Sequence, residues 1–134
     1  MVLFTGGAFQ GKRTAMQSIF GIADHEIMDG KESADDKSAA ERDSRAKAVA
    51  AFDHYHLCIR RQMEQGLDPL EELEKLYRER PDIILLCDEV GQGIVPLEQK
   101  ERDYREAVGR TMCAAAAKAD AVYRVICGIA ERIK

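Results

Sequence analysis

The sequence predicts an α/β fold, in which helices on two sides cover a mostly parallel sheet to make a three-layer sandwich. Apolar runs of strand length alternate with segments of helix length along the chain, as they do in sandwiches of this kind. The run "DIILLCDEVG" (82–91) is almost continuously apolar, which is typical of a strand covered on both faces. A chain of 134 residues is long enough for one core, so we expect a single domain over residues 1–134.

The first elements are a strand over Val2–Thr5 and a helix over about 12–20, joined by a glycine-rich loop. Residues 24–47 then carry more acids than bases, and almost no large apolar side chains beyond Ile27 and Met28. We therefore expect 24–47 to be a polar surface segment, part of it mobile.

Residues 48–63 allow two interpretations. Their alanines favour a helix, but "AVAAF" followed by Asp53 also fits a short strand of small residues that leads into a helix from about His54. We favour the strand. A further helix begins at Pro69, because Asp68 can cap it, and it ends before the next proline.

A long helix and a strand follow the apolar run. The helix extends from about Leu97 to Ala119, with an apolar face that includes Tyr104 and Val108. The run "AVYRVICG" (121–128) predicts the final strand. Acids and bases four residues apart on the other face of the helix predict three ion pairs: Glu98/Arg102, Glu101/Arg105 and Glu106/Arg110.

Composition excludes several classes of partner. The net charge is −4 and no long basic run occurs, so we expect no nucleic-acid partner. No apolar run approaches the ~20 residues that span a bilayer, and residues 1–9 lack the features of a signal peptide. We expect a cytoplasmic protein without a membrane partner. The cysteines are widely spaced, so we interpret them as buried free thiols and assign no metal ligands among Cys58, Cys87, Cys113 and Cys127.

The loop after the first strand, "TGGAFQGKRT", has the Gly-x4-Gly-Lys spacing of a phosphate-binding loop, which makes the predicted sandwich P-loop NTPase-like. Glycines let the backbone wrap inward, so that N–H groups and a helix N-terminus point at phosphate oxygens. The bland alternative is a glycine turn that binds nothing. We predict a nucleotide-binding site made by Gly6, Gly7, Ala8, Phe9, Gln10, Gly11, Lys12, Arg13 and Thr14.

Arg13 departs from this motif. The residue after the lysine is ordinarily Ser or Thr, whose hydroxyl coordinates Mg²⁺, and a guanidinium cannot coordinate a cation. Thr14 does not simply replace it, since one residue along a helix rotates a side chain by about 100°. We expect ATP or GTP as the substrate, with Mg²⁺ beside it, and Arg13 is the residue that argues against ordinary metal coordination.

Other candidate residues follow strands. Asp53, if it ends a strand, can hold a metal through water, or it can be a helix cap or a surface charge. Asp88 and Glu89 end the apolar strand at the edge where α/β sheets bind ligands, or they form an exposed pair. His54 and His56 lie either near the phosphates or on the surface of a helix.

Motifs at both ends of the chain point to one enzyme family. The start reads "TGGAFQGK", and the last third of the chain combines, in register, Glu89-Val90-Gly91, Gly93-Ile94-Val95-Pro96, Arg102, Tyr104-Arg105, Gly109-Arg110, Ala119-Asp120 and Gly128. Together these stretches resemble the bifunctional adenosylcobinamide kinase/adenosylcobinamide-phosphate guanylyltransferase family of cobalamin biosynthesis, in a short variant.

The resemblance implies a P-loop nucleotide-binding fold, often assembled as a trimer, that phosphorylates the aminopropanol hydroxyl of adenosylcobinamide. The family then transfers GMP from GTP through a covalent guanylyl-histidine, so a nucleotide and a corrinoid are the implied partners. Residues 89–96 would form part of the site wall, and Arg102 and Arg105 would hold a conformation or face phosphates. The phosphate-binding role carries over to Gly6, Gly7, Gly11 and Lys12.

Departures from the family leave two hypotheses for function. The middle segment that supplies the guanylylated histidine is missing, and Met112-Cys113 stands where Asn-Gln is common. The first hypothesis is an enzyme that uses ATP or GTP. The second is a nucleotide-binding sensor or subunit that has lost catalysis. For the enzyme, the candidate catalytic residues are Lys12, Asp53, Glu89, His54 and His56.

Overall fold

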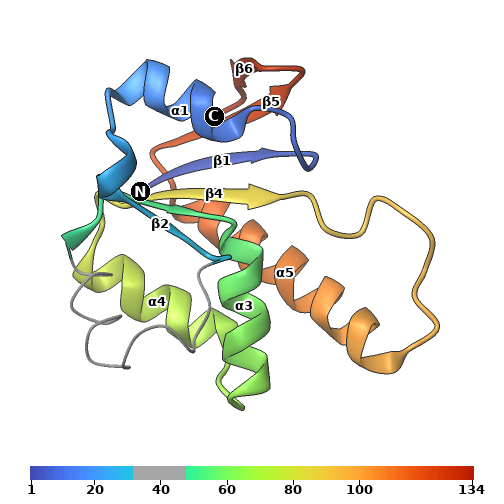
Figure 1. Ribbon diagram of the computed structural model, residues 1–134. Helices are drawn as coiled ribbons and strands as arrows, with labels where there is room; N and C mark the ends of the chain where they lie inside the picture. Colours follow the sequence, from blue (N-terminus) through green and yellow to red (C-terminus); the bar gives the residue numbers. More distant parts are fainter. Residues whose placement is uncertain (32–47) are drawn as a thin grey trace.

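A computed structural model describes residues 1–31 and 48–134, and within them the chain forms a six-stranded sheet in the order β2-β3-β4-β1-β5-β6 (Figure 1). Every neighbouring pair is parallel except β5 and β6, which are antiparallel. The strands are β1 (Val2–Gly6), β2 (Ile27–Asp29), β3 (Ala51–Asp53), β4 (Ile84–Asp88), β5 (Ala121–Ile126) and β6 (Ile129–Arg132).

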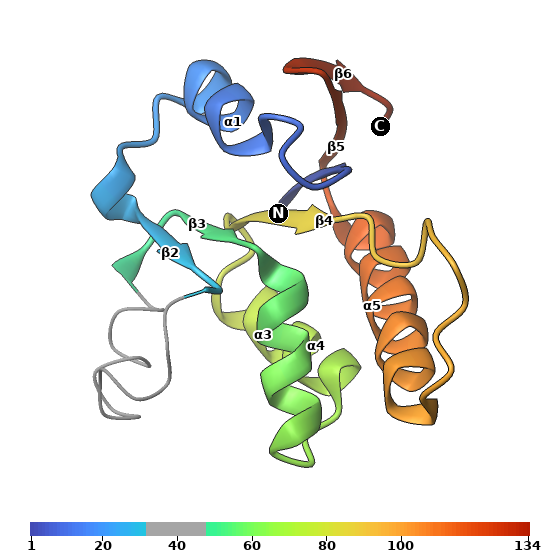
Figure 2. The ribbon, with the colours of Figure 1, turned by 45° about the vertical axis from the view of Figure 1, so that its right-hand side comes forward.

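Helices cover both faces of the sheet, as Figures 1 and 2 show. Helix α1 lies on one face, and α3, α4 and α5 lie on the other, so the predicted three-layer α/β sandwich is confirmed. The helices are α1 (Lys12–Phe20), the 3₁₀ turn η1 (Asp24–Glu26), α3 (Tyr55–Glu64), α4 (Pro69–Glu79) and α5 (Gln99–Lys118).

Alternation along the strands explains why both faces need a cover. On β1, Leu3 belongs to the core under α3, α4 and α5, whereas Phe4 belongs to the core under α1. Neighbouring Leu85 and Leu86 on β4 divide in the same way, and both are fully buried. A central parallel strand thus buries successive side chains in two separate cores, which accounts for its unbroken apolar sequence.

The helices begin where the sequence predicts. The Asp68 carboxylate accepts a hydrogen bond of 2.9 Å from the Leu70 N–H and caps α4. Only one of the three predicted ion pairs along α5 is present, Glu106 with Arg110 at 3.7 Å. Glu101 instead pairs with Arg60 of α3 at 2.6 Å, because α3 packs beside α5 and brings the guanidinium within reach.

Arg102 and Arg105 of α5 hold the loop that follows β4. Arg102 donates a hydrogen bond of 2.9 Å to the Pro96 carbonyl oxygen, and Arg105 donates one of 2.7 Å to that of Ile94. The family resemblance implied two alternative roles for these arginines, and their hydrogen bonds fit the role of holding the loop in one conformation.

Three predictions need correction. We expected residues 24–47 to be a polar surface segment, but Ile27 and Met28 are buried in β2. Residues 32–47 of that segment lie outside the described residues. The strand β6 was not predicted. Two of the four free cysteines, Cys113 and Cys127, are exposed rather than buried, because one lies on the outer face of α5 and the other in the β5–β6 turn.

No helix in residues 1–31 or 48–134 is long and apolar enough to cross a membrane.

Candidate functional site

The glycine-rich loop joins β1 to α1 and needs glycine at two positions. Gly6 has φ of 155°, and a Cβ there would lie 2.3 Å from the Val125 carbonyl oxygen of β5. Gly11, at the start of α1, has φ of 83°, in the left-handed region that glycine occupies without strain. The loop therefore follows a path that larger residues would resist.

The turn between β5 and β6 braces this loop. The Gly128 N–H donates a hydrogen bond of 2.9 Å to the Gln10 carbonyl oxygen, and the Cys127 N–H donates one of 2.6 Å to Gln10 Oε1. The middle of the loop projects outward by contrast, with Ala8 exposed and Phe9 97% exposed.

Lys12 is buried at the base of the loop, with only 6% of its side chain exposed. Its Nζ lies 2.6 Å from Asp88 Oδ1, and it donates hydrogen bonds of 3.2 Å and 2.8 Å to the carbonyl oxygens of Gly6 and Gly7. Asp88 ends β4, the strand beside β1. Three oxygens therefore hold the lysine ammonium at the carboxyl edge of the sheet.

Arg13 points to the other side, toward the ends of β2 and β3. Its Nη2 lies 3.0 Å from Asp24 Oδ1, while its Nη1 lies 3.7 Å from both Asp29 Oδ2 and Asp53 Oδ2. The hydrogen bond from the Gln17 amide lowers the pKa of Asp24 most, and the ion pair with Arg13 lowers it further. Thr14 is exposed on α1, so its hydroxyl does not replace the missing one.

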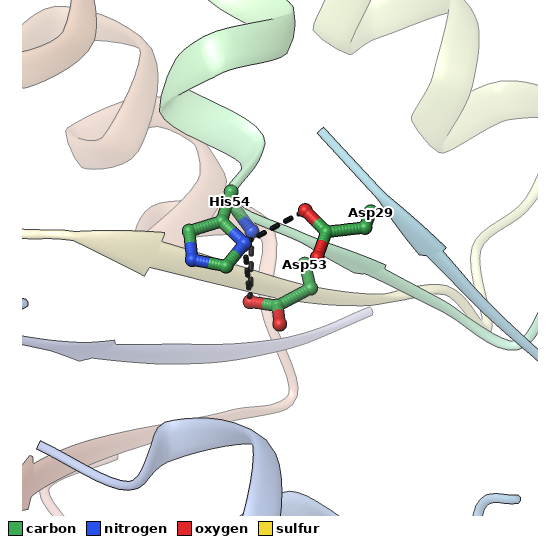
Figure 3. A group of neighbouring side chains, drawn as sticks. All are labelled: Asp29, Asp53 and His54. Atoms are coloured by element: carbon green, nitrogen blue, oxygen red, sulfur yellow. Dashed lines mark hydrogen bonds and ion pairs between the residues drawn. The ribbon is translucent and has the colours of Figure 1, made fainter. Parts of the chain in front are cut away.

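Asp29, Asp53 and His54 form a compact cluster, drawn in Figure 3. His54 Nδ1 lies 2.8 Å from Asp29 Oδ1 and 3.5 Å from Asp53 Oδ1. Burial raises the pKa of the Asp29 carboxyl, but the hydrogen bond from the Lys31 N–H and the nearby imidazole together hold it below its ordinary value. Asp53 does end a strand, as its place in the sequence suggested.

His56 and Glu89 lie beside the site without joining this cluster. The Asp88 N–H donates a hydrogen bond of 3.4 Å to His56 Nδ1, and burial lowers the pKa of the imidazole although Asp88 opposes that effect. Glu89 pairs with Arg124 of β5 at 3.2 Å. Its carboxylate is thus directed to the neighbouring strand.

A cavity of about 330 Å³ lies beside the loop, the Lys12–Asp88 ion pair, and the cluster of Asp29, Asp53 and His54. It brings together most of the predicted loop residues with Asp53 and His54. Gly6, Gly7, Ala8, Thr14, His56 and Glu89 are not among its lining residues. Those that line it are Phe9, Gln10, Gly11, Lys12, Arg13, Asp29, Lys31, Asp53, His54 and Asp88.

The sequence did not predict Asp29, which is one of the three residues of this cluster. The signal was present, because Ile27-Met28-Asp29 repeats on a smaller scale the pattern of an apolar strand followed by an acid. The high charge of the surrounding residues concealed it.

One of two comparisons with known proteins places the chain in a family. The model of the family described as cobinamide kinase / cobinamide phosphate guanyltransferase matches residues 25–133, which is most of the chain and includes Asp29, Asp53, His54 and Asp88. The glycine-rich loop lies before the matched region. The comparison with curated proteins gave no match.

Proposed function

Because the chain belongs to the cobinamide kinase/cobinamide phosphate guanyltransferase family, whose members are transferases of cobalamin biosynthesis, we propose that it binds ATP or GTP in the glycine-rich loop and phosphorylates a cobinamide hydroxyl. The observation that carries the proposal is the position of Lys12, buried at the foot of the loop and facing the cavity beside Asp88. A nucleotide whose phosphates enter the cavity would receive the lysine charge and the loop N–H groups.

Lys12, Asp29 and Asp53 have defined parts in this proposal. Lys12 leaves the two loop carbonyl oxygens for the β- and γ-phosphates, and Asp53 lies where it can orient the acceptor hydroxyl or a metal-bound water. Mg²⁺ bound with the nucleotide would neutralise developing phosphate charge. Carboxylate oxygens of Asp29 and Asp53 suit that ion, whereas Arg13 does not. Glu89, paired with Arg124, is less well placed for this role.

The Asp29–His54 pair favours guanylyl transfer as a second activity. The chain has three histidines, and among them His54 alone lines the cavity; His25 is exposed in η1. Asp29 holds its Nδ1, so the other ring nitrogen is available to attack the α-phosphorus of GTP with departure of pyrophosphate. This assignment replaces the absent central histidine of the family.

The competing hypothesis is a nucleotide-binding sensor or subunit without catalysis. The ion pairs of Arg13 with three carboxylates support it, because a guanidinium and a metal ion compete for the same carboxylate groups. Tight nucleotide binding that is indifferent to Mg²⁺, with no turnover, would favour this alternative.

The experiment incubates the protein with adenosylcobinamide, Mg²⁺ and either ATP or GTP, and follows phosphorylated cobinamide by mass spectrometry. We expect product with the unmodified protein, none with Lys12→Met, and undiminished product with Lys75→Met, which removes an exposed lysine from α4. Separately, GTP labelled in the α-phosphate should leave acid-labile label on the protein, and His54→Asn but not His25→Asn should abolish it. Absence of both product and label would overturn the enzyme proposal.

A further inference from the structure

We propose that Asp29, Asp53 and His54 form a binding site for a first-row transition-metal dication, which the protein holds before any nucleotide arrives. Asp29 and Asp53 are also the carboxylates proposed above for the Mg²⁺ that accompanies a nucleotide, and the imidazole of His54 is what favours a transition metal when no nucleotide is bound. The proposal concerns binding by the nucleotide-free protein and does not require transferase activity. Because coordination through Nδ1 leaves the proton on Nε2, His54 serves at any one time either as this ligand or as the acceptor of the guanylyl group.

The spacing of the three ligand atoms fits one bound ion. Bonds of about 2.1 Å at right or tetrahedral angles would separate neighbouring ligand atoms by about 3.0 to 3.4 Å. His54 Nδ1 lies 2.8 Å from Asp29 Oδ1 and 3.5 Å from Asp53 Oδ1, and the ligand atoms of the cluster all lie within 4.8 Å of one another. The two distances from His54 Nδ1 lie within a few tenths of an ångström of that range.

The backbone holds these atoms in place. Asp29 and Asp53 are direct partners in the β2–β3 register, so parallel pairing fixes the separation of the two carboxylates. His54 follows with φ of 50°, an uncommon left-handed conformation for a residue with a side chain. Gly30 permits this bend, since a Cβ there would lie 2.4 Å from the His54 carbonyl oxygen.

Hydrogen bonds orient the two carboxylates. The Lys31 N–H donates to Asp29 Oδ1 and the His54 N–H donates to Asp53 Oδ1, both at 2.8 Å. Such contacts around metal-binding carboxylates keep the ligand geometry fixed. Arg13 approaches the opposite oxygens of both, at 3.7 Å, and its closer contact with Asp24 at 3.0 Å lets it withdraw without losing every partner.

The donor set predicts the class of metal. Two carboxylate oxygens and one imidazole nitrogen suit Mn²⁺, Co²⁺ or Zn²⁺, whereas Mg²⁺ prefers oxygen ligands and retains its waters. Three protein ligands leave coordination positions open, and the cluster lines the cavity. Water or a phosphate oxygen can therefore complete the coordination sphere.

The test is a titration of the untagged, nucleotide-free protein with Mn²⁺, followed by electron paramagnetic resonance. Mn²⁺ avoids the exposed thiols of Cys113 and Cys127, which would bind Zn²⁺. We expect one site, nitrogen coupling from an imidazole in the spin-echo spectrum, displacement by Zn²⁺, and affinity for Mg²⁺ at least about tenfold weaker than for Mn²⁺.

Variants identify the ligands. Asp29→Asn and His54→Asn should each weaken Mn²⁺ binding at least about tenfold, and His54→Asn should abolish the nitrogen coupling. Asparagine is chosen at 54 because it tolerates the left-handed backbone. The matched controls His25→Asn and Asp82→Asn remove exposed groups elsewhere and should leave the affinity unchanged.

Some results of this titration would contradict the proposed metal site. No bound Mn²⁺, or equal affinity in folded Asp29→Asn and in the unmodified protein, would overturn the site; circular dichroism confirms folding of each variant. A spectrum without nitrogen coupling would overturn His54 as a ligand. Neither result bears on cobinamide phosphorylation, which is measured separately.

Discussion

Lys12 and Arg13 are neighbours in sequence but lie in different regions of the site. Lys12 is 6% exposed and is held at 2.6 to 3.2 Å by Asp88 and by two backbone carbonyl oxygens between β1 and β4. Arg13 is 36% exposed, and it spans three carboxylates at 3.0 to 3.7 Å beside β2 and β3. We call these regions the lysine centre and the arginine flank.

The two regions differ in how tightly their charged groups are paired and in how much water reaches them. The lysine centre is closely paired and poorly exposed, so a change there disturbs the fold as well as any ligand. The arginine flank is looser and closer to water, so its ion pairs contribute little to stability and exchange readily. We therefore expect large structural effects from the centre and mainly ligand effects from the flank.

Lys12→Met should have the largest effect. It leaves the Asp88 carboxylate, 17% exposed, without its cation, which should lower the free energy of unfolding by about 2 to 3 kcal/mol. Urea denaturation measures this loss. The double variant Lys12→Met/Asp88→Asn should recover part of it, because the unpaired charge is removed. A loss below about 1 kcal/mol would mean that the lysine centre contributes no more to stability than the arginine flank.

Gly30→Ala should come next and tests the backbone of the flank. The added Cβ would meet carbonyl oxygens of His54 and Asp53 at 2.4 and 3.1 Å, so we expect about 2 kcal/mol of destabilisation. Thermal unfolding is the measurement. Gly93→Ala is the matched control, since no atom lies within 4 Å of its Cβ position, and it should stay within about 0.5 kcal/mol of the unmodified protein.

Arg13→Thr should alter ligands more than stability. Arg13 is 36% exposed and lies 3.7 Å from Asp29 and Asp53, so the loss of these long ion pairs should change the free energy of unfolding by less than about 1 kcal/mol. The new hydroxyl, together with the released carboxylates, should strengthen the Mg²⁺ dependence of nucleotide binding, measured by calorimetry with and without the metal. Unchanged Mg²⁺ dependence would show that the metal ligand was never at this position.

The smallest effect is a pH dependence from His56 beside the lysine centre. Its pKa is lowered in the folded protein from 6.5, mainly by burial, so the unfolded chain binds the proton more readily. Stability is therefore complete above pH 6.5 and falls as the pH drops toward the folded pKa. The His56→Gln variant should show a weaker pH dependence of the urea denaturation midpoint in this pH range. Replacement of the exposed His25 in His25→Gln should leave that pH dependence unchanged. The lowered pKa of Asp29 acts separately, below its ordinary value of 3.8.

The sequence predicted the elements that build the lysine centre, although not the Lys12–Asp88 ion pair, because the signals for these elements are local. Glycine spacing gives the path of the loop, and apolar runs locate β1 and β4 with Asp88 at the end of one of them. The family resemblance agrees with the matched family over residues 25–133. Nucleotide binding by the loop stays a prediction.

The arginine flank could not be predicted in the same way. Its cluster depends on the pairing of Asp29 with Asp53, which are distant in sequence, and on the unusual backbone of His54. The three-residue strand β2 carries too little hydrophobic pattern to be recognised within a charged segment, whereas β3 was predicted from the run that ends at Asp53. Glu101 illustrates the same limit, since a partner on another helix displaced the local one.

The position of β1 in the sheet has a consequence for synthesis on the ribosome. Its two neighbours are β4 and β5, at residues 84–88 and 121–126, and the turn at 127–128 braces its loop. A chain emerging at about 5–20 residues per second must therefore wait several seconds after β1 appears before that strand finds its second partner. Of the strands around the loop, the one that is translated first therefore waits longest for its second partner.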